Sequence, residues 1–216
     1  MFTATAVTIF SLIVLLFSVI IHELAHGYVA RSLGDPTAEY AGRLTLNPLK
    51  HLDPFGSVIL PLLLLLSSFA SGGSGIILGW AKPVPINPYN FKDQKWGTLK
   101  VAISGPLSNF GIAFIFGSFI RFLSFPQTFP LIQLMSIVVY INILLGLFNL
   151  IPIPPLDGSW ILFRFLPASA EKIRMALQQY GIFILILLLF SGVLNGFYLL
   201  VNMIFYLFVG GIFVFP

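Results

Sequence analysis

The sequence predicts an all-α polytopic membrane protein, and both its composition and its segment lengths indicate this fold class. Of the 216 residues, 58% are hydrophobic and 8% are charged, and the mean hydropathy is +1.00. Soluble domains carry about a quarter charged residues, and several apolar segments here reach the roughly 20 residues of a membrane-spanning helix. We expect a single domain over 1–216, with about five transmembrane helices plus a re-entrant helix and extended arm at about 55–90.

The charge pattern indicates membrane topology rather than binding to nucleic acid. The formal net charge is +4, but the 11 Lys and Arg residues lie in loops between apolar segments, where they face anionic lipid. The expected surroundings are therefore the lipid bilayer, while the oligomeric state stays open. Because the chain has no cysteine, any zinc site must use His, Asp or Glu.

The first apolar segment, at about 4–30, is long enough to cross the membrane as a helix. Arg31 and the Gly-Asp-Pro triplet at 34–36 stop that helix. The segment lacks the basic start of a signal peptide, so we expect it to be retained. Residues 35–54 are polar and rich in turn formers, and they predict an interfacial loop in which the alternating residues 41–46 could form a strand.

Four further apolar segments follow the loop. They lie at 55–78, which is broken by Pro61 and by glycines at 71–75, and at 101–123, 131–151 and 181–215. At 1.5 Å per residue, the last one is too long for a single span of a core about 30 Å thick. A turn at 192–196 would divide it into two short helices. The alternative is one long tilted helix that packs through its small residues Gly192 and Gly196.

A zinc-binding pattern lies within the first apolar segment, where charged groups are costly. His22 and His26 stand four residues apart, so a helix places both rings on one face. Together with Glu23 they form the H-E-x-x-H arrangement, in which two histidines bind Zn²⁺ and the glutamate acts as general base toward a water. The expected cofactor is one zinc ion.

Asp157 is the candidate for a third ligand, because catalytic zinc usually has three protein ligands. Of the seven acidic residues, only Asp157 directly follows an apolar segment in an unusual context, which is the proline-rich stretch 149–158. The prolines prevent regular helix, and such backbone is tolerated at membrane depth only inside protein or along a cavity. A carboxylate before Gly158 could also be simply a turn residue.

A shared ion would fix the topology of the chain. The ends of the first helix and of the 131–151 helix would then lie on one side of the membrane, so 55–78 must enter, turn and return. Ten of the 11 basic residues then fall on one side and Arg121 on the other. The positive-inside rule places that basic side, with the site, toward the cytoplasm and the N-terminus outside.

The returning arm at 76–90 contains Pro83, Pro85 and Pro88, which oppose helix and favour an extended edge. Such an edge could pair with an extended peptide. We therefore expect Val84, Ile86 and Asn87 to bind substrate, although turn chemistry before Pro88 explains Asn87 equally well.

Four motifs together resemble the site-2 protease family of intramembrane zinc metalloproteases. They are HELAHG at 22–27, GWAKPVPINP at 79–88, SGPLSN at 104–109 and NLIPIPPLDG at 149–158. In order and spacing they cover most of the chain to about residue 166. The resemblance is to a short form without PDZ or CBS domains, with a catalytic core at about 4–166 followed by C-terminal helices at about 181–215.

The resemblance implies an endopeptidase that hydrolyses peptide bonds within or near transmembrane segments of membrane protein substrates. The small size of the chain is compatible with a prokaryotic plasma membrane. The resemblance also implies His22, His26 and Asp157 as zinc ligands, Glu23 as catalytic base and Asn149 as a residue that steadies substrate or oxyanion. The alternatives are an inactive zinc-binding protein that binds transmembrane helices, or a metal transporter. Asn109 is expected to serve helix packing and hydrogen bonding, and His51 to have a structural role in its loop.

Overall fold

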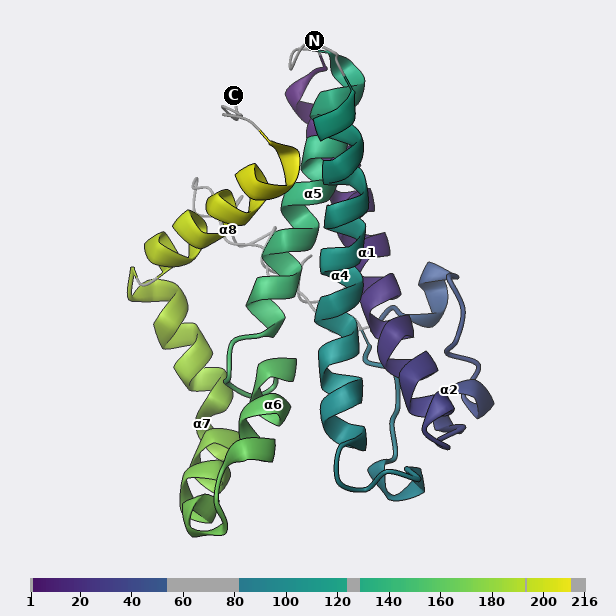
Figure 1. The fold of residues 1–216 in the computed structure, drawn as a ribbon, viewed down its shortest axis with the longest axis vertical. Coiled ribbons are helices and arrows are strands. Elements are labelled where there is room, and N and C mark those ends of the chain that lie inside the picture. Colours follow the sequence, from purple (N-terminus) through teal and green to yellow (C-terminus); the bar gives the residue numbers. More distant parts are fainter. Residues whose placement is uncertain (1, 54–81, 124–128, 193, 211–216) are drawn as a thin grey trace, which may run out of the picture.

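The computed structural model describes residues 2–53, 82–123, 129–192 and 194–210, and in these ranges the fold is all-helical, as predicted (Figure 1). The longer helices are α1 (Ala4–Ser32), α4 (Gly97–Phe122), α5 (Pro130–Asn149), α6 (Asp157–Phe165), α7 (Glu171–Phe190) and α8 (Leu194–Val209). The shorter ones are α2 (Thr37–Tyr40), η1 (Pro48–Lys50), η3 (Pro88–Asn90) and η4 (Ala168–Ala170). The strand considered at 41–46 is wrong, because those residues form turns and bends. Within the described ranges there is no strand with which this stretch could pair.

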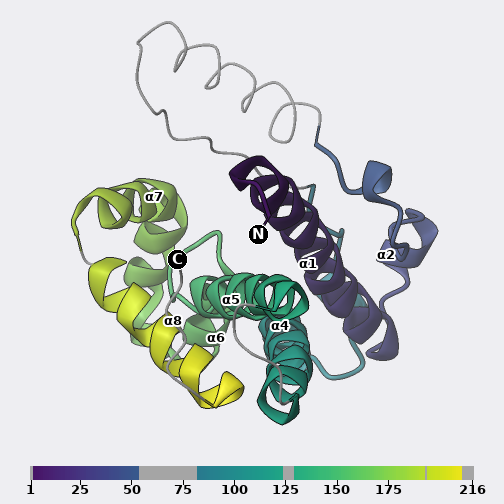
Figure 2. The ribbon, with the colours of Figure 1, turned by 90° about the horizontal axis from the view of Figure 1, so that it is seen from above.

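Helices α1, α4 and α5 are long and apolar enough to cross a membrane. Helix α4 packs against both of the others, and α1 and α5 also contact each other, so the three form the centre of the molecule (Figure 2). Three candidate spans are found in the described residues, so the expected number of about five is not confirmed. The apolar part of α8, Gly196–Val209, is shorter than those spans.

Helix α8 completes an apolar core with α4 and α5. The buried side chains come from all three helices: Ala113 and Ile120, then Ile132, Val139 and Ile143, then Val201, Phe205 and Val209. The two-helix interpretation of the C-terminal segment is confirmed, because α7 and α8 separate at Gly192, whose φ of 75° lies in the left-handed region that favours glycine. The single long helix is wrong.

The chain leaves α1 and returns to α4 at the same end of the molecule. The backbone N–H of Lys92 donates to the carbonyl of Leu33 at 2.8 Å, and that of Lys82 donates to the carbonyl of His51 at 2.9 Å. The predicted re-entrant segment 55–78 itself lies outside the described residues. The second hydrogen bond joins His51 and Lys82, which lie on the two sides of the segment.

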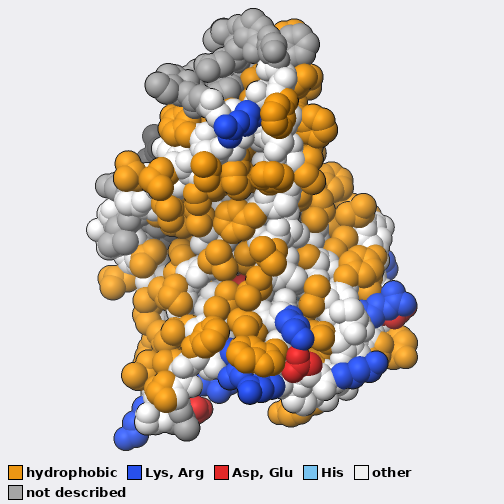
Figure 3. Space-filling model, in the orientation of Figure 1, with side chains coloured by type: hydrophobic (Ala, Val, Ile, Leu, Met, Phe, Trp, Pro, Cys, Tyr) orange, Lys and Arg blue, Asp and Glu red, His pale blue; other side chains and the backbone are white. Residues whose placement is uncertain are grey.

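Charged side chains gather at this same end, whereas the middle of the surface is mostly apolar (Figure 3). Arg31 lies in the last turn of α1 and Arg164 in the last turn of α6, while Arg121 lies in the last turn of α4, at the opposite end. With its apolar spans this distribution fits an integral membrane protein.

Candidate metal centre

The two histidines of the first motif lie on the face of α1 that packs against α4. Both are buried, at 5% and 6% exposure, and their rings meet edge to face with centroids 4.7 Å apart. Their Nε2 atoms are 3.1 Å apart. One turn of helix therefore places the two nitrogens where one ion can contact both.

Asp157, the first residue of α6, completes the cluster. Its Oδ2 lies 3.0 Å from Nε2 of His22 and 3.2 Å from Nε2 of His26. The turn before it depends on the next residue, because a Cβ at Gly158 would collide with the carbonyls of Leu150 and Ile151. The structure thus brings together the three residues that the sequence predicted to share one ion, and their donor atoms could hold a metal.

Hydrogen bonds on the far side of each ring fix the tautomers. Nδ1 of His22 lies 2.6 Å from Oδ1 of Asn109, and Nδ1 of His26 lies 2.7 Å from the carbonyl oxygen of Val101. Because both partners are acceptors, each Nδ1 donates its proton and each Nε2 of a neutral ring presents a lone pair. This is the outer support that metal-binding histidines use.

The three inward-facing atoms are therefore all acceptors, and a cation fits them. Oδ2 of Asp157 is buried and has no hydrogen-bond partner in the described residues. Zinc ligands at about 2.1 Å in a tetrahedral arrangement would lie roughly 3.4 Å from one another, and the three atoms form a triangle of 3.0 to 3.2 Å. The donor set and its size thus suit zinc.

Helix α4 approaches the centre through a glycine. A Cβ built on Gly105 would lie 2.5 Å from Nε2 of both His22 and His26. Any side chain there would push the helices apart or displace the rings. The sequence signal was the SGPLSN motif, but the spacing alone could not place Gly105 against the histidines.

A buried polar chain extends from His22 across the three central helices. Asn109 of α4 donates from Nδ2 to Oδ1 of Asn142 at 3.0 Å, and Asn142 of α5 donates to Oγ of Ser18 in α1 at 2.9 Å. All of these side chains are buried. The hydrogen-bonding role predicted for Asn109 is therefore observed, whereas Asn142 was missed. Its signal was an amide within an otherwise apolar segment.

Glu23 lies beside the returning arm. Its Oε2 accepts a hydrogen bond from the backbone N–H of Val84 at 2.8 Å. The Val84 side chain is 5% exposed and points toward Gly27, where a Cβ would lie 3.1 Å from it. Residues 82–87 form neither helix nor strand, so the arm meets the glutamate through its backbone.

The other predicted residues of the arm make contacts within the protein. Ile86 packs against a buried cluster that includes Phe91. The side chain of Asn87 accepts from the N–H of Tyr89, and its own N–H donates to Asp35 at 2.7 Å. Their role in binding substrate stays a prediction.

Asp35 fastens the arm to the end of α1. It is fully buried, and its carboxylate accepts from Thr37, from the backbone of Asn87 and from the side chain of Asn90. Burial alone would raise the pKa of Asp35, but these hydrogen bonds outweigh it and hold that pKa below its ordinary value.

Two further candidate residues make local hydrogen bonds. The Asn149 amide donates to the carbonyl of Leu145 in its own helix at 3.0 Å, so its predicted catalytic role stays a prediction. Nε2 of His51, the residue directly after η1, lies 2.8 Å from the carbonyl of Thr45 before η1 and donates to it.

Membrane helices that carry an H-E-x-x-H pair, with an aspartate completing the acceptor set, define a zinc metalloprotease. The chain belongs to peptidase family M50, the site-2 protease family. The sequence profile of that family matches residues 126–192.

Three relatives from different organisms support the assignment. "Putative zinc metalloprotease YwhC" of Bacillus subtilis is 40% identical over 87% of this chain and 82% of its own length. "Putative zinc metalloprotease Rip2" of Mycolicibacterium smegmatis is 29% identical over 83% of this chain and 66% of its own length. "Putative zinc metalloprotease MJ0611" of Methanocaldococcus jannaschii is 33% identical over 72% of this chain and 70% of its own length. No solved structure matches the chain. The cofactor is zinc.

Proposed function

We propose that the protein is an endopeptidase that cleaves membrane protein substrates within or near their transmembrane segments. The observation that carries this proposal is the triangle of three acceptor atoms, two on the membrane helix α1 and one at the start of α6, with Glu23 directly following the first histidine. In this proposal His22, His26 and Asp157 hold the zinc ion. Bound zinc lowers the pKa of a water molecule and polarises the scissile carbonyl.

Glu23 is the proposed general base. Its carboxylate takes a proton from the attacking water and later delivers it to the leaving amine nitrogen. The Val84 N–H orients that carboxylate from the arm. Asn109 and Val101 keep the protons of the two rings on Nδ1, so that both Nε2 lone pairs stay available. Asn149 is proposed to steady the substrate carbonyl as its oxygen gains charge.

A transmembrane helix hides its carbonyls in hydrogen bonds, so the substrate must unwind before it is cleaved. We propose that the unwound strand lies along the arm at 82–87, near Val84, Ile86 and Asn87. The hydrogen bond between Val84 and Glu23 supports this position. Unchanged cleavage after Ile86→Asp, in protein that still binds zinc, would contradict it.

The basic end of the molecule, which carries the metal centre, is proposed to face the cytoplasm of a prokaryotic cell, with the N-terminus outside. The whole chain is proposed to act as one protease domain. Labelling of single cysteines introduced at Lys50 and Thr3, from either side of sealed vesicles, tests the orientation. Labelling of Lys50→Cys from the outside only would contradict it.

The central experiment is reconstitution of the wild type, Glu23→Gln and Glu39→Gln with zinc, followed by cleavage of a single-span substrate. Loss of a general base slows such reactions by about 10²- to 10⁴-fold, so Glu23→Gln should keep its zinc and lose cleavage. Glu39 pairs with Arg31 on the surface, and its variant should cleave like the wild type. Cleavage by Glu23→Gln at the wild-type rate would refute the base. Zinc binding without cleavage by any of the three would favour a binding protein.

A further inference from the structure

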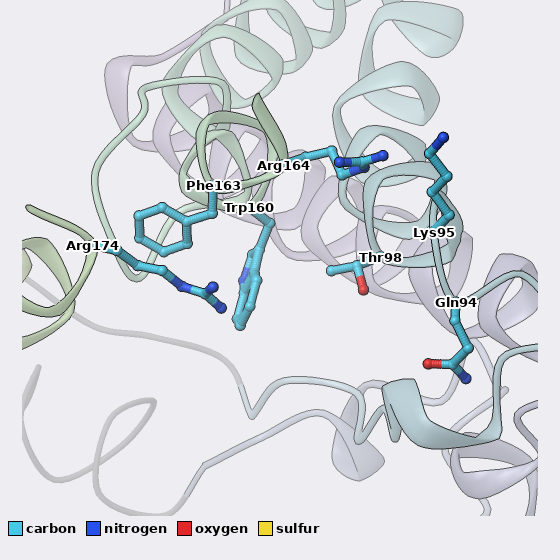
Figure 4. A pocket seen from close by; sticks show the side chains of 7 residues that line it. All are labelled: Gln94, Lys95, Thr98, Trp160, Phe163, Arg164 and Arg174. Atoms are coloured by element: carbon cyan, nitrogen blue, oxygen red, sulfur yellow. The ribbon is translucent and has the colours of Figure 1, made fainter. Parts of the chain in front are cut away.

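A cavity lies near the basic end of the molecule, between the start of α4 and helices α6 and α7. Its volume is about 490 Å³, and its walls include Lys95, Thr98, Trp160, Phe163, Arg164 and Arg174. Figure 4 shows Arg174 reaching in beside Trp160, with Arg164 and Lys95 on the side of Thr98. None of the residues of the metal centre lines it.

The cavity is positively charged, and none of the described residues that line it is acidic. Arg174 has one carboxylate neighbour, Glu171, at 4.0 Å, whereas Lys95 and Arg164 form no ion pair within the described ranges. Other carboxylates of the chain are engaged elsewhere: Glu23 with Val84, Asp35 with the arm, Glu39 with Arg31, Asp93 with Lys100 and Asp157 with the histidines. An anion is therefore the ligand that these charges suit.

Aromatic rings hold the two guanidinium groups in place. Arg164 lies 4.2 Å from the ring centroid of Trp96, and Arg174 lies 5.3 Å from that of Phe163. Stacking leaves the N–H edges of a guanidinium free for an acceptor. One of these donors, Nε of Arg164, is buried without a hydrogen-bond partner in the described part of the chain. A buried donor of this kind is costly unless a ligand accepts from it.

The position favours a lipid as the source of that anion. The cavity lies at the end where the basic residues gather, and Trp96 and Trp160 beside it are typical of the membrane interface. Phe165 and Ile173, the chain neighbours of Arg164 and Arg174, are 67% and 57% exposed, so acyl chains could lie against these apolar side chains. We propose that this cavity binds the phosphate of an anionic lipid headgroup.

Lipid binding to the full-length, zinc-loaded protein tests the proposal without reference to proteolysis. Phosphatidylglycerol and phosphatidylcholine, each offered in nanodiscs or mixed micelles, are compared for the wild type, for Arg164→Gln with Arg174→Gln, and for Lys50→Gln with Lys172→Gln. The control pair removes two exposed charges outside the cavity. A hydrogen bond from a charged group contributes at least about tenfold, so the cavity pair should weaken phosphatidylglycerol binding roughly 100-fold. The control pair loses only the salt-screened attraction of exposed charges and should weaken it less.

Four results would overturn the proposal. The first two are equal weakening by both pairs and no preference for phosphatidylglycerol over phosphatidylcholine. The third is displacement of the lipid by inorganic phosphate alone at equal concentration, which would indicate a free-phosphate site. The fourth is binding of an acidic peptide without binding of phosphatidylglycerol, which would indicate a site for protein carboxylates. Arg164→Lys keeps the positive charge but loses the planar guanidinium that stacks on Trp96. It should therefore bind phosphatidylglycerol more weakly than the wild type. Unchanged thermal melting verifies that each variant is folded.

Discussion

Two aspartates, Asp35 and Asp157, each join segments that are far apart in the sequence, yet their surroundings are opposite. Asp35 is fully buried, and the donors of Thr37, Asn87 and Asn90 satisfy its oxygens. Asp157 faces the lone pairs of two imidazoles, and its Oδ2 has no donor among the described residues. A carboxylate surrounded by N–H groups is complete, whereas one surrounded by acceptors needs a cation. The neighbours, and not the residue type, separate the structural aspartate from the proposed metal ligand.

The largest expected effect comes from Asp157→Ala. The wild type should hold about one zinc ion per chain, and this variant should hold close to none after dialysis, because only two ligands remain. Metal analysis of the purified protein measures the ratio. Asp35→Ala should keep its zinc as long as it is folded. Zinc retained by Asp157→Ala would contradict the proposed ligand, and zinc lost by folded Asp35→Ala would remove the contrast between the two aspartates.

Asp35→Ala should instead reduce stability, by about 3 kcal/mol, since it leaves several buried donors without an acceptor. Unfolding by denaturing detergent, followed by circular dichroism, measures the change. Glu39→Ala is the control, because its ion pair with Arg31 is exposed and worth little. Equal loss of stability in both variants would show that the hydrogen bonds of Asp35 contribute no more than the exposed ion pair of Glu39.

The same carboxylate predicts how stability depends on pH. Because the folded-state pKa of Asp35 is lowered, its contribution is complete above the unfolded pKa of about 3.9 and is lost as the pH falls through the folded value. The stability of the wild type should therefore fall more steeply below about pH 4 than that of Asp35→Ala. Parallel acid curves for the two proteins would contradict this assignment.

The sequence predicted the parts of the centre that follow from local periodicity or from an unusual sequence context. His22, Glu23 and His26 follow from helical spacing, and Asp157 was expected beside them because of its proline-rich position and the need for a third ligand. Other features depend on how distant helices and loops pack, which residue spacing does not encode. They are the hydrogen bonds of Asn142, the approach of Gly105 to the histidines, and the hydrogen bonds that Asp35 accepts from the arm. Similarly, α7 begins at Glu171 rather than near 181 because its first turns are polar, so hydropathy alone does not detect them.

Among Asp157→Ala, Asp35→Ala and Gly105→Ala, we expect the smallest effect from Gly105→Ala. This variant tests whether the triangle of three acceptor atoms depends on the close contact between α1 and α4. The added methyl group would lie 2.5 Å from the ring nitrogens, and overpacking of this kind costs about 1 to 3 kcal/mol. Zinc affinity measured by chelator competition should therefore fall by roughly 5- to 150-fold. Gly111→Ala is the matched control, since it lies in the same helix with nothing within 4 Å of the new Cβ. If both variants bind zinc like the wild type, the rings adjust without cost and the triangle is set by α1 and α6 alone. If only Gly105→Ala weakens binding, α4 is part of what holds the three acceptors together.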